Sequence, residues 1–189
     1  IICDNSVIPN KNDEYAKRFG LTYIDMDDNR GLSTAYNAGV LQASGDVICF
    51  FDDDTIVCDS YFKAVSDLYE DSDQWDIALP LVKAGDIILS PCKFRGFRVT
   101  VFTDTSQIVE FPYLSGINSG MVVRHSVFSK VSYDENLFLD FVDHKLIADA
   151  RQTGLSVVFL RGPVLQQNFS LITDTADAAV SVISEKFCW

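Results

Sequence analysis

Three consecutive aspartates, Asp52, Asp53 and Asp54, directly follow a run of apolar residues that is typical of a buried strand. Carboxylates at the point where such a strand leaves the sheet lie at the edge where α/β folds bind ligands. Two carboxylates one residue apart can share a hard divalent cation such as Mg²⁺ or Mn²⁺, which also binds phosphate oxygens. The turn is therefore a candidate site for a metal-bound diphosphate, and the alternative is an ordinary solvated acidic turn.

Two further polar features could contact a nucleotide. Asp4 and Asn5 follow the first apolar run of the chain and could form hydrogen bonds with a base or a ribose, although an Asx turn is the simpler interpretation of this pair. Asn37 lies in the middle of a predicted helix among small residues, where it lowers helix propensity. Its side chain therefore needs a partner, which could be a ligand or a neighbouring loop.

A cluster of acidic residues leads into a predicted helix at residues 141–153. Asp143 falls in the first turn of this helix, where the helix dipole favours an ionised carboxylate. Such a carboxylate can take a proton from an alcohol that is being activated. Asp140 lies just before the helix, and for this residue we favour a charge that only complements the dipole.

The residue patterns of several other kinds of functional site are absent from the sequence. The five cysteines are an odd number without a C-x-x-C pair, which indicates buried free thiols in a reducing compartment, and the two histidines lack close His or Cys neighbours for a zinc site. Phosphate-binding, dinucleotide-binding and G-x-S-x-G motifs are absent. The segment that starts at Asp25 resembles a calcium loop, but it has Arg30 and Tyr36 where that loop needs Gly and Glu.

The charge of the chain is strongly acidic and unevenly distributed. The net charge is −12, and residues 1–76 hold 16 acidic against 5 basic side chains. Such a surface repels phosphate backbones, so we expect no nucleic-acid partner. A phosphorylated small ligand would need a bridging cation.

Length and hydropathy indicate one soluble domain over residues 1–189, with 48% hydrophobic residues and no apolar run of the roughly 18 residues that a membrane span needs. We expect the protein in the cytoplasm, with the inner face of the membrane as an alternative. A basic aromatic patch could touch an anionic lipid surface or a lipid-diphosphate acceptor, but the solvated face of a hairpin is the favoured interpretation. The patch consists of Lys93, Phe94, Arg95, Phe97 and Arg98.

The elements that must position these residues alternate between short apolar strands and amphipathic helices, which is typical of an α/β fold. We predict helices at residues 13–19, 32–43, 59–70, 126–131 and 141–153. The helix at 59–70 has Phe62, Val65, Leu68 and Tyr69 at the spacing of one buried face. We predict strands at residues 1–3, 21–26, 46–51, 77–82, 87–89, 97–102, 108–111, 120–123 and 156–160, with a hairpin insertion between 76 and 112.

Several segments, in their order and spacing, resemble the family 2 glycosyltransferases with the A-type fold, and most closely their rhamnosyltransferase-like branch. The likeness covers residues 1 to about 160. The segments are IICDNS, NRGLSTAYNAGV, ASGDVICFFDDDT, SGINSGMVVRHSVFSKVSYDENLFLDFVDHKL and ARQTGLSVV.

The resemblance implies a single nucleotide-diphospho-sugar transferase domain, with a mixed, mostly parallel central sheet that is flanked by helices. It implies a nucleotide-binding half at 1–75, an acceptor-binding half at 76–165 and a tail at 166–189. Asp143 would be the catalytic base. The donor nucleotide would contact Asp4, Asn5, Asn37, Asp52 and Asp53; the metal would contact Asp52 and Asp54; and the acceptor would contact Gly116, Asn118, Ser119 and Asp140.

The sequence departs from the family pattern in three places. Members begin with one more strand, which carries nucleotide contacts and which this chain lacks before Ile1. Lys145 stands two residues after the base, where relatives often have an acid, so the acceptor pocket would differ. The amides of Gln166, Gln167 and Asn168 stand where relatives commonly have a metal-contacting His.

The resemblance therefore implies an inverting glycosyltransferase that depends on Mn²⁺ or Mg²⁺. It would transfer a hexose or deoxyhexose from a nucleotide-sugar donor to a glycan or lipid-linked acceptor in surface polysaccharide synthesis, and peripheral membrane contact stays open. One alternative is a non-catalytic domain that binds nucleotide-sugars or carbohydrates. Another is a sugar nucleotidyltransferase, but the Gly-rich, Arg-containing loop that this class needs after its first strand is not found.

Overall fold

The computed structural model describes residues 1–8, 10–71, 74–96, 98–111 and 113–167. Phe97 of the basic aromatic patch, Asn168, Cys188 and nearly all of the expected tail at 166–189 lie outside these ranges. Within them, Cys3, Cys49, Cys58 and Cys92 are free thiols; the expectation that such thiols are buried holds for Cys92, whereas the other three are partly exposed.

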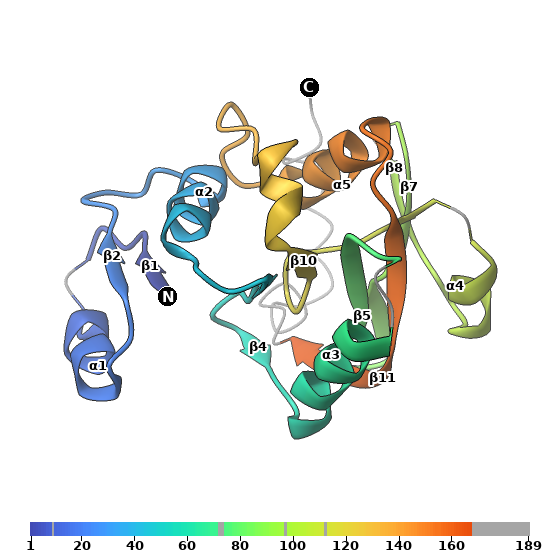
Figure 1. The fold of residues 1–189 in the computed structure, drawn as a ribbon, viewed down its shortest axis with the longest axis horizontal. Coiled ribbons are helices and arrows are strands. Elements are labelled where there is room, and N and C mark those ends of the chain that lie inside the picture. The colour runs from blue at the N-terminus through green and yellow to red at the C-terminus, as the bar shows by residue number, and fades with distance from the viewer. Residues whose placement is uncertain (9, 72–73, 97, 112, 168–189) are drawn as a thin grey trace, which may run out of the picture.

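The N-terminal part of the chain forms a small parallel sheet of two strands beside one helix (Figure 1). The helix ends at Gly20, whose φ of +65° is the left-handed conformation that favours glycine after a helix. Its amide donates back to the last turn, which reverses the chain toward the second strand. These elements are β1 (Ile2–Asp4), α1 (Asn12–Phe19) and β2 (Tyr23–Asp25).

The central sheet has six strands in the order β3-β10-β5-β11-β4, with β6 paired to β5. It is mixed, as expected, but the expectation of a mostly parallel sheet is wrong. Antiparallel pairs outnumber parallel ones, because β10 runs opposite to both β3 and β5, and only β5 and β11 pair in parallel. The strands are β3 (Val47–Cys49), β4 (Thr55–Ile56), β5 (Ile77–Ala84), β6 (Ile87–Ser90), β10 (Val122–Arg124) and β11 (Val157–Gln167).

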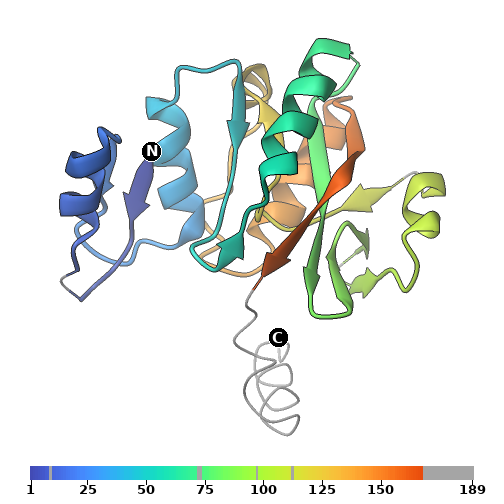
Figure 2. The same ribbon diagram turned by 90° about the horizontal axis from the view of Figure 1, so that it is seen from below.

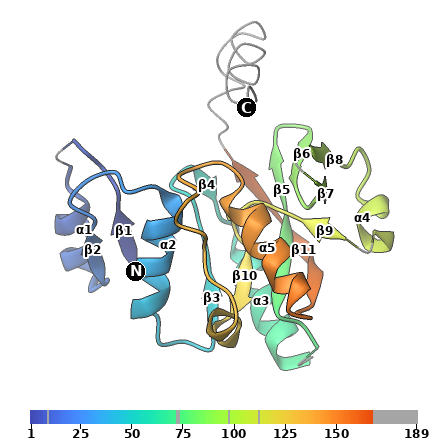
Figure 3. The ribbon, with the colours of Figure 1, turned by 90° about the horizontal axis from the view of Figure 1, so that it is seen from above.

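Helices cover both faces of this sheet (Figures 1 and 3). The side chains of β5 alternate between two apolar clusters: Ile77 and Leu79 belong to the cluster that contains α5 residues, and Ala78 and Val82 belong to the cluster under α3. Burial on both faces explains why β5 reads as a nearly continuous apolar run. The helices of this part are α2 (Leu32–Gln42), α3 (Asp59–Asp71) and α5 (Val142–Gln152), and the short 3-10 helix η1 spans His125–Ser129.

The buried face of α3 is rotated from the predicted one. Tyr61 is fully buried and donates its hydroxyl to the carbonyl of Gly120 at 2.9 Å, whereas Phe62 and Tyr69 are 57% and 40% exposed. Val65 and Leu68 pack against the core as expected. A polar partner for the Tyr61 hydroxyl decides the orientation, because a buried tyrosine needs one.

The segment between β6 and β10 contains the expected hairpin, but one strand that the sequence predicts here is absent from the described residues. Residues 108–111 do not form a strand, since α4 (Ser106–Glu110) occupies most of this range and Asp104 accepts a hydrogen bond from the Ser106 amide at 2.9 Å, which starts the helical turn. The strands of this three-stranded sheet, in the order β8-β7-β9, are β7 (Cys92–Arg95), β8 (Arg98–Val101) and β9 (Leu114–Ser115).

The two sheets that flank α2 do not pair with each other in the described residues. A cavity separates β1 from β3, and Ile2, Cys3, Val47 and Ile48 are among the residues that line it. The strands lie on either side of α2 in Figures 2 and 3. Among the described residues no helix is long and apolar enough to cross a membrane.

Candidate functional site

The cavity between the two sheets contains the predicted acidic turn. Its volume is about 970 Å³, and its lining includes all three aspartates of the turn, Asp4 and Asn5 at the end of β1, and Gln167 at the end of β11. The turn begins three residues after Cys49, the last residue of β3, and so projects from the carboxyl end of that strand. The position agrees with the edge where α/β sheets bind ligands.

Two hydroxyl groups hold the carboxylate of Asp52. Tyr36 of α2 donates to Oδ1 at 2.5 Å, and Ser119 donates to Oδ2 at 2.5 Å. Desolvation and the charge of Asp52 raise the pKa of Tyr36 well above its usual range, so this tyrosine remains a protonated donor. Hydrogen bonds of this kind fix the orientation of the Asp52 carboxylate.

Asp54 pairs with the end of the last strand. Gln167 Nε2 donates to Asp54 Oδ1 at 2.9 Å, while Gln167 Oε1 is buried and has no hydrogen-bond partner. A buried amide oxygen without a partner is costly unless a ligand satisfies it. Rotation of the Gln167 amide would present this oxygen beside the Asp54 carboxylate.

Asp52, Asp54 and Gln167 fit a hard divalent cation that takes its remaining coordination positions from a bound diphosphate or from water. In the part of the chain that the structure describes, His, Cys, Asp and Glu side chains form no group of three that could hold a metal ion by themselves. Asp52, Asp54 and the Gln167 amide offer oxygen donors only, which suits Mg²⁺ or Mn²⁺ with diphosphate oxygens or waters in the other positions. Asp53 is exposed at the mouth of the turn.

Asp143 is a buried carboxylate in the first turn of α5, with 14% of its side chain exposed. Desolvation raises its pKa; the neighbouring His144 and its amide, which donates to Asp143 Oδ1 at 2.6 Å, act in the opposite direction, and the charge of Asp52 adds to the increase. Asp143 is not among the residues that line the cavity with Asp52, so its place beside the donor remains a prediction. Phe141, before the helix, has a left-handed φ of +63°, which is uncommon for a bulky residue and marks a constrained turn.

Asn37 uses its polar atoms on a neighbouring loop. Its Nδ2 donates to the carbonyl of Tyr133 at 3.0 Å and to Glu135 at 2.9 Å, and its Oδ1 accepts from the Tyr133 amide at 3.1 Å. The residue does not line the cavity. Of the two partners expected for Asn37, the structure shows the neighbouring loop. A contact with the nucleotide stays a prediction.

Asp4 lines the cavity but is already the centre of a polar network. Its Oδ2 accepts from Asn10, Asn12 and Tyr23 at 2.9, 3.0 and 2.9 Å, and its Oδ1 accepts from the Ser6 amide at 3.0 Å. Desolvation would raise the pKa of Asp4, but these hydrogen bonds outweigh it and hold the pKa well below its usual range.

Asn5, beside it in the same cavity, accepts a hydrogen bond from the Arg30 amide through its Oδ1 at 3.0 Å. The Nδ2 group is not needed for that contact and is the part of the side chain that a ribose or base could use.

The residues expected on the acceptor side do not form one surface. Asn118 and Ser119 are 2% and 0% exposed, and Gly116 is packed against Leu79 and Ser90. Asp140 is exposed at the entrance to α5. None of the four lines the cavity, so their contact with an acceptor remains a prediction.

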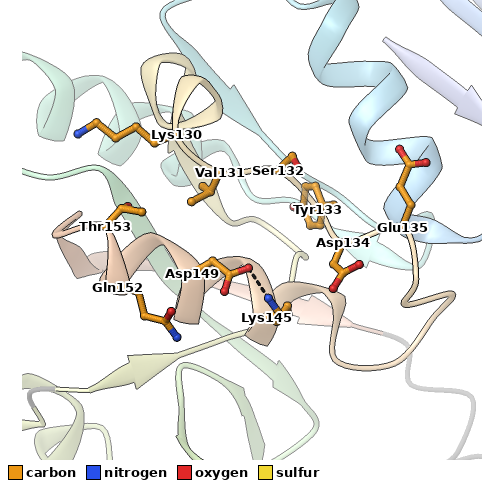
Figure 4. Close-up of a pocket in the computed structure, with 10 residues that line it drawn as sticks. All are labelled: Lys130, Val131, Ser132, Tyr133, Asp134, Glu135, Lys145, Asp149, Gln152 and Thr153. Carbon is orange, nitrogen blue, oxygen red and sulfur yellow. Dashed lines mark hydrogen bonds and ion pairs between the residues drawn. The ribbon is translucent and has the colours of Figure 1, made fainter.

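Lys145 lines a second hollow beside α5, with a volume of about 550 Å³ (Figure 4). Its ammonium group pairs with Asp149 at 2.6 Å, one helical turn further on. Lys130 lines the same hollow. The charge of Lys145 is therefore engaged on the helix surface.

Two members of the basic aromatic patch, Lys93 and Phe94, pack against other side chains. The Lys93 ammonium lies 4.8 Å from the ring centroid of Phe102 and 5.7 Å from that of Phe111, and Phe94 stacks on His144. Arg95 and Arg98 are exposed on the hairpin. The exposed arginines agree with the favoured interpretation of a solvated hairpin face, whereas the packed Lys93 and Phe94 do not.

Sequence reasoning did not identify Tyr36, Tyr133 or the pair of Ser115 with His144 as parts of the site. Tyr36 and Tyr133 stack with ring centroids 5.0 Å apart beside Asp52, and Ser115 Oγ lies 2.7 Å from His144 Nδ1. Tyr36 precedes Asn37 in a helix of small residues, which was an available signal. The other contacts join segments far apart in the chain and leave no local pattern.

A family model described as "Glycosyl transferase family 2" matches residues 1–102. No curated protein sequence matches the chain. Solved structures give the fold: GalNAc-T7 with UDP, GalNAc and Mn²⁺ has a TM-score of 0.62 at 16% identity over 83% of this chain and 34% of its own. Glucosyl-3-phosphoglycerate synthase from Mycobacterium tuberculosis, with Mn²⁺, UDP and glucosyl-3-phosphoglycerate, has a TM-score of 0.55 at 10% identity over 93% of this chain and 63% of its own. The chain thus spans less than two thirds of either structure.

Proposed function

The chain belongs to glycosyl transferase family 2, and from this premise we propose that it moves a sugar from a nucleotide-sugar donor to a hydroxyl group of an acceptor, with inversion and with a divalent cation. The observation that carries the proposal is the pairing of two different carboxylate environments. Asp52 is hydrogen-bonded to hydroxyls in an oxygen-rich turn, whereas Asp143 is desolvated and has a raised pKa. Such a pair divides the work between charge binding and proton transfer.

The reaction is a direct displacement. Asp143 takes the proton of the acceptor hydroxyl while the acceptor oxygen attacks the anomeric carbon, and the bond from that carbon to the diphosphate breaks on the opposite face. The nucleoside diphosphate leaves with the electron pair of the broken bond. Asp52 and Asp54 would hold a divalent cation, which would stabilise the charge of this leaving group.

The finer assignment rests on the resemblance to the rhamnosyltransferase-like branch. It comprises a hexose or deoxyhexose donor, a glycan or lipid-linked acceptor in surface polysaccharide synthesis, and a place in the cytoplasm or at the inner face of the membrane. The two solved structures above were crystallised with Mn²⁺ and UDP, which supports starting the donor tests with UDP-sugars and Mn²⁺.

The test is a transfer assay with UDP-glucose, UDP-galactose, UDP-N-acetylglucosamine, GDP-mannose and dTDP-rhamnose as donors and a panel of p-nitrophenyl glycosides as acceptors, with Mn²⁺, Mg²⁺ or EDTA. Asp143→Asn should lower kcat by about 100- to 10,000-fold, the usual contribution of a general base, while the Kd of the nucleoside diphosphate stays unchanged. Asp54→Asn should instead raise the Mn²⁺ concentration that gives half-maximal rate.

The matched control is Asp67→Asn, which makes the same chemical change on the outer face of α3, where Asp67 pairs with Lys63 at 2.9 Å. Its rates should equal those of the wild type. Metal-dependent binding of a nucleoside diphosphate without any turnover, by the wild type and Asp143→Asn alike, would favour the non-catalytic binding domain.

A further inference from the structure

One buried segment, residues 115–119, is hydrogen-bonded to Asp52 at one end and to His144, the neighbour of Asp143, at the other. At one end Ser119 Oγ donates to Asp52 Oδ2 at 2.5 Å. At the other end Ser115 Oγ is hydrogen-bonded to Nδ1 of His144 at 2.7 Å, and His144 directly follows Asp143 in α5. The segment, which we call the bridging segment, therefore connects the donor side of the site with the catalytic helix by side-chain hydrogen bonds at both ends.

The bridging segment has little freedom to move. Ser115, Asn118 and Ser119 are 1%, 2% and 0% exposed, and Asn118 Oδ1 accepts a hydrogen bond from the Tyr133 hydroxyl at 2.7 Å. A Cβ on Gly116 would collide with Ser90 Oγ and lie 3.0 Å from Leu79. A segment without room for one methyl group can transmit a displacement from one end to the other, because packed interiors do not deform freely.

The imidazole of His144 is fixed as firmly. It is 6% exposed and stacks on Phe94 with ring centroids 4.6 Å apart and an interplanar angle of 12°, and Phe141 lies 6.0 Å away on the same ring. Its Nδ1 lies 3.9 Å from Asp143 Oδ1, too far for a hydrogen bond but close enough for an electrostatic effect. Desolvation lowers the pKa of His144 against the opposing charge of Asp143, so the ring is neutral at neutral pH.

We propose that His144 is a positioning residue for the transfer: through its hydrogen bond to Ser115 it anchors the bridging segment to α5 and thereby fixes the separation of Asp143 from the donor-side carboxylate Asp52. This inference rests on the proposed function. Transfer to an acceptor requires the base, the acceptor oxygen and the anomeric carbon within a few tenths of an ångström, and a misplacement of about 1 Å can cost about 100-fold. Water, which is small and mobile, tolerates a looser site as an acceptor. Loss of the anchor should therefore reduce transfer more than donor hydrolysis.

The test compares Ser115→Ala, His144→Phe, His144→Asn and the double variant Ser115→Ala with His144→Phe, each with the UDP-sugar and p-nitrophenyl glycoside on which the wild type is most active, in Mn²⁺. Phenylalanine keeps the stack on Phe94 but loses the polar atom, and asparagine places an amide near the position of Nδ1. Ser115→Ala and His144→Phe should each lower the ratio of transfer to hydrolysis about tenfold, with donor KM unchanged, and His144→Asn should recover part of the loss.

The double variant separates positioning from stability. Each single change leaves a buried polar atom without its partner and destabilises the fold, whereas replacing both partners by apolar groups can be nearly neutral. We therefore expect the double variant to regain thermal stability without regaining the transfer ratio. Ser33→Ala, which alters a buried serine whose hydroxyl has no hydrogen-bond partner, is the control and should keep the wild-type ratio.

Two results would overturn the inference while leaving the proposed function in place: single variants with the wild-type ratio of transfer to hydrolysis, or a double variant in which the ratio returns together with the melting temperature. A wild type that neither transfers nor hydrolyses any donor would overturn the proposed function, and the role of His144 with it.

Discussion

At the residue scale, Asp143 is a carboxylate whose burial favours function at the expense of stability. Its folded-state pKa is raised, mainly by desolvation, so its charge destabilises the fold at every pH above the unfolded-state value and not below it. The same increase brings its pKa closer to the working pH, where a general base is most effective. The two consequences can be measured separately.

The first prediction concerns the pH dependence of Asp143. In the wild type kcat/KM should fall on acidification through the raised pKa, at a higher pH than the titration of an exposed aspartate would give. Asp143→Asn should melt about 2–4 °C higher than wild type at neutral pH, as expected for roughly 1 kcal/mol in a chain of this size, and this difference should disappear in acid. An Asn variant that is less stable at neutral pH would show that the carboxylate is stabilised by contacts rather than strained by burial.

The second prediction concerns Asp4, whose folded-state pKa is shifted in the opposite direction to that of Asp143. Its folded-state pKa is lowered by a set of hydrogen bonds, so the stability that it contributes is present above the unfolded-state pKa and is lost as the pH falls toward the folded-state value. Asp4→Asn would turn an amide NH₂ toward the donors of Asn10, Asn12 and Tyr23. It should lower the free energy of unfolding by roughly 2–3 kcal/mol at neutral pH, measured by urea denaturation.

The control for Asp4 is the exposed Asp86, where the same change should be within about 0.5 kcal/mol of the wild type. A nucleoside diphosphate titration of both variants then separates the two possible roles of Asp4. If Asp4→Asn keeps its stability but loses nucleotide affinity, the carboxylate is a ligand contact and its network is secondary.

At the element scale, the sequence predicted those parts of the fold in which local pattern and burial agree. The buried strand β5 and the helix α5 were both identified, because their apolar residues follow one period and a turn or a glycine ends them. The prediction of a strand at 108–111 was wrong, because a short apolar run is compatible with both a strand and a helix. A local contact, the hydrogen bond from the Ser106 amide to Asp104, selects the helix here.

The site was predictable to the same extent. The acidic turn and Asp143 follow from rules about where strands end and helices begin. The hydroxyl partners of Asp52 and the anchor at His144 were not predictable, since Tyr36, Ser119 and Ser115 reach these residues only through tertiary packing.

The third prediction tests how α2 is joined to the loop before α5. Gly31 has a φ of +83°, and a Cβ there would lie 2.7 Å from the Phe138 carbonyl oxygen, which also accepts the Leu32 amide at 2.7 Å. Gly31→Ala therefore adds a collision to the strain of a backbone conformation (φ +83°, ψ 162°) that is essentially restricted to glycine, and should destabilise by roughly 3 kcal/mol or more, with loss of transfer activity.

Gly154→Ala is the matched control, because Gly154 has a φ of +81° with no atom within 4 Å of the added Cβ. This variant should lose only the conformational term of about 1–2 kcal/mol and keep its activity. Equal destabilisation of both variants in urea would mean that the contact with Phe138 does not hold the joint.

At the scale of the whole molecule, the donor cavity joins two parts that share no strand pairing among the described residues. The two-stranded sheet contributes Asp4 and Asn5, and the six-stranded sheet contributes the acidic turn and Gln167. The helix α2 connects them through Tyr36 and Asn37, whose partners Asp52 and Tyr133 lie on the far side. A ligand that fills the cavity should therefore hold both parts together.

The net charge of −12 limits which ligands can fill the cavity and hold the two parts together. A nucleoside diphosphate alone meets carboxylates at the cavity end, and its binding should be weak because like charges repel. With Mn²⁺ between the turn and the diphosphate, the repulsion becomes attraction. Binding to the folded state at about 100 times Kd adds about 2.7 kcal/mol, which corresponds to a rise in melting temperature of roughly 5–10 °C for a chain of this size.

The fourth prediction is a thermal-shift experiment with UDP, GDP and dTDP, each with Mn²⁺, with Mg²⁺ and with EDTA. At least one nucleotide should raise the melting temperature in the presence of the cation and not in EDTA, and Asp54→Asn should reduce the rise while Asp67→Asn keeps it. Hydrogen exchange with the same ligand should show new protection in both β1 and the acidic turn, because the ligand spans the two parts. Protection confined to one of them would place the nucleotide outside the cavity and would separate the acidic turn from donor binding.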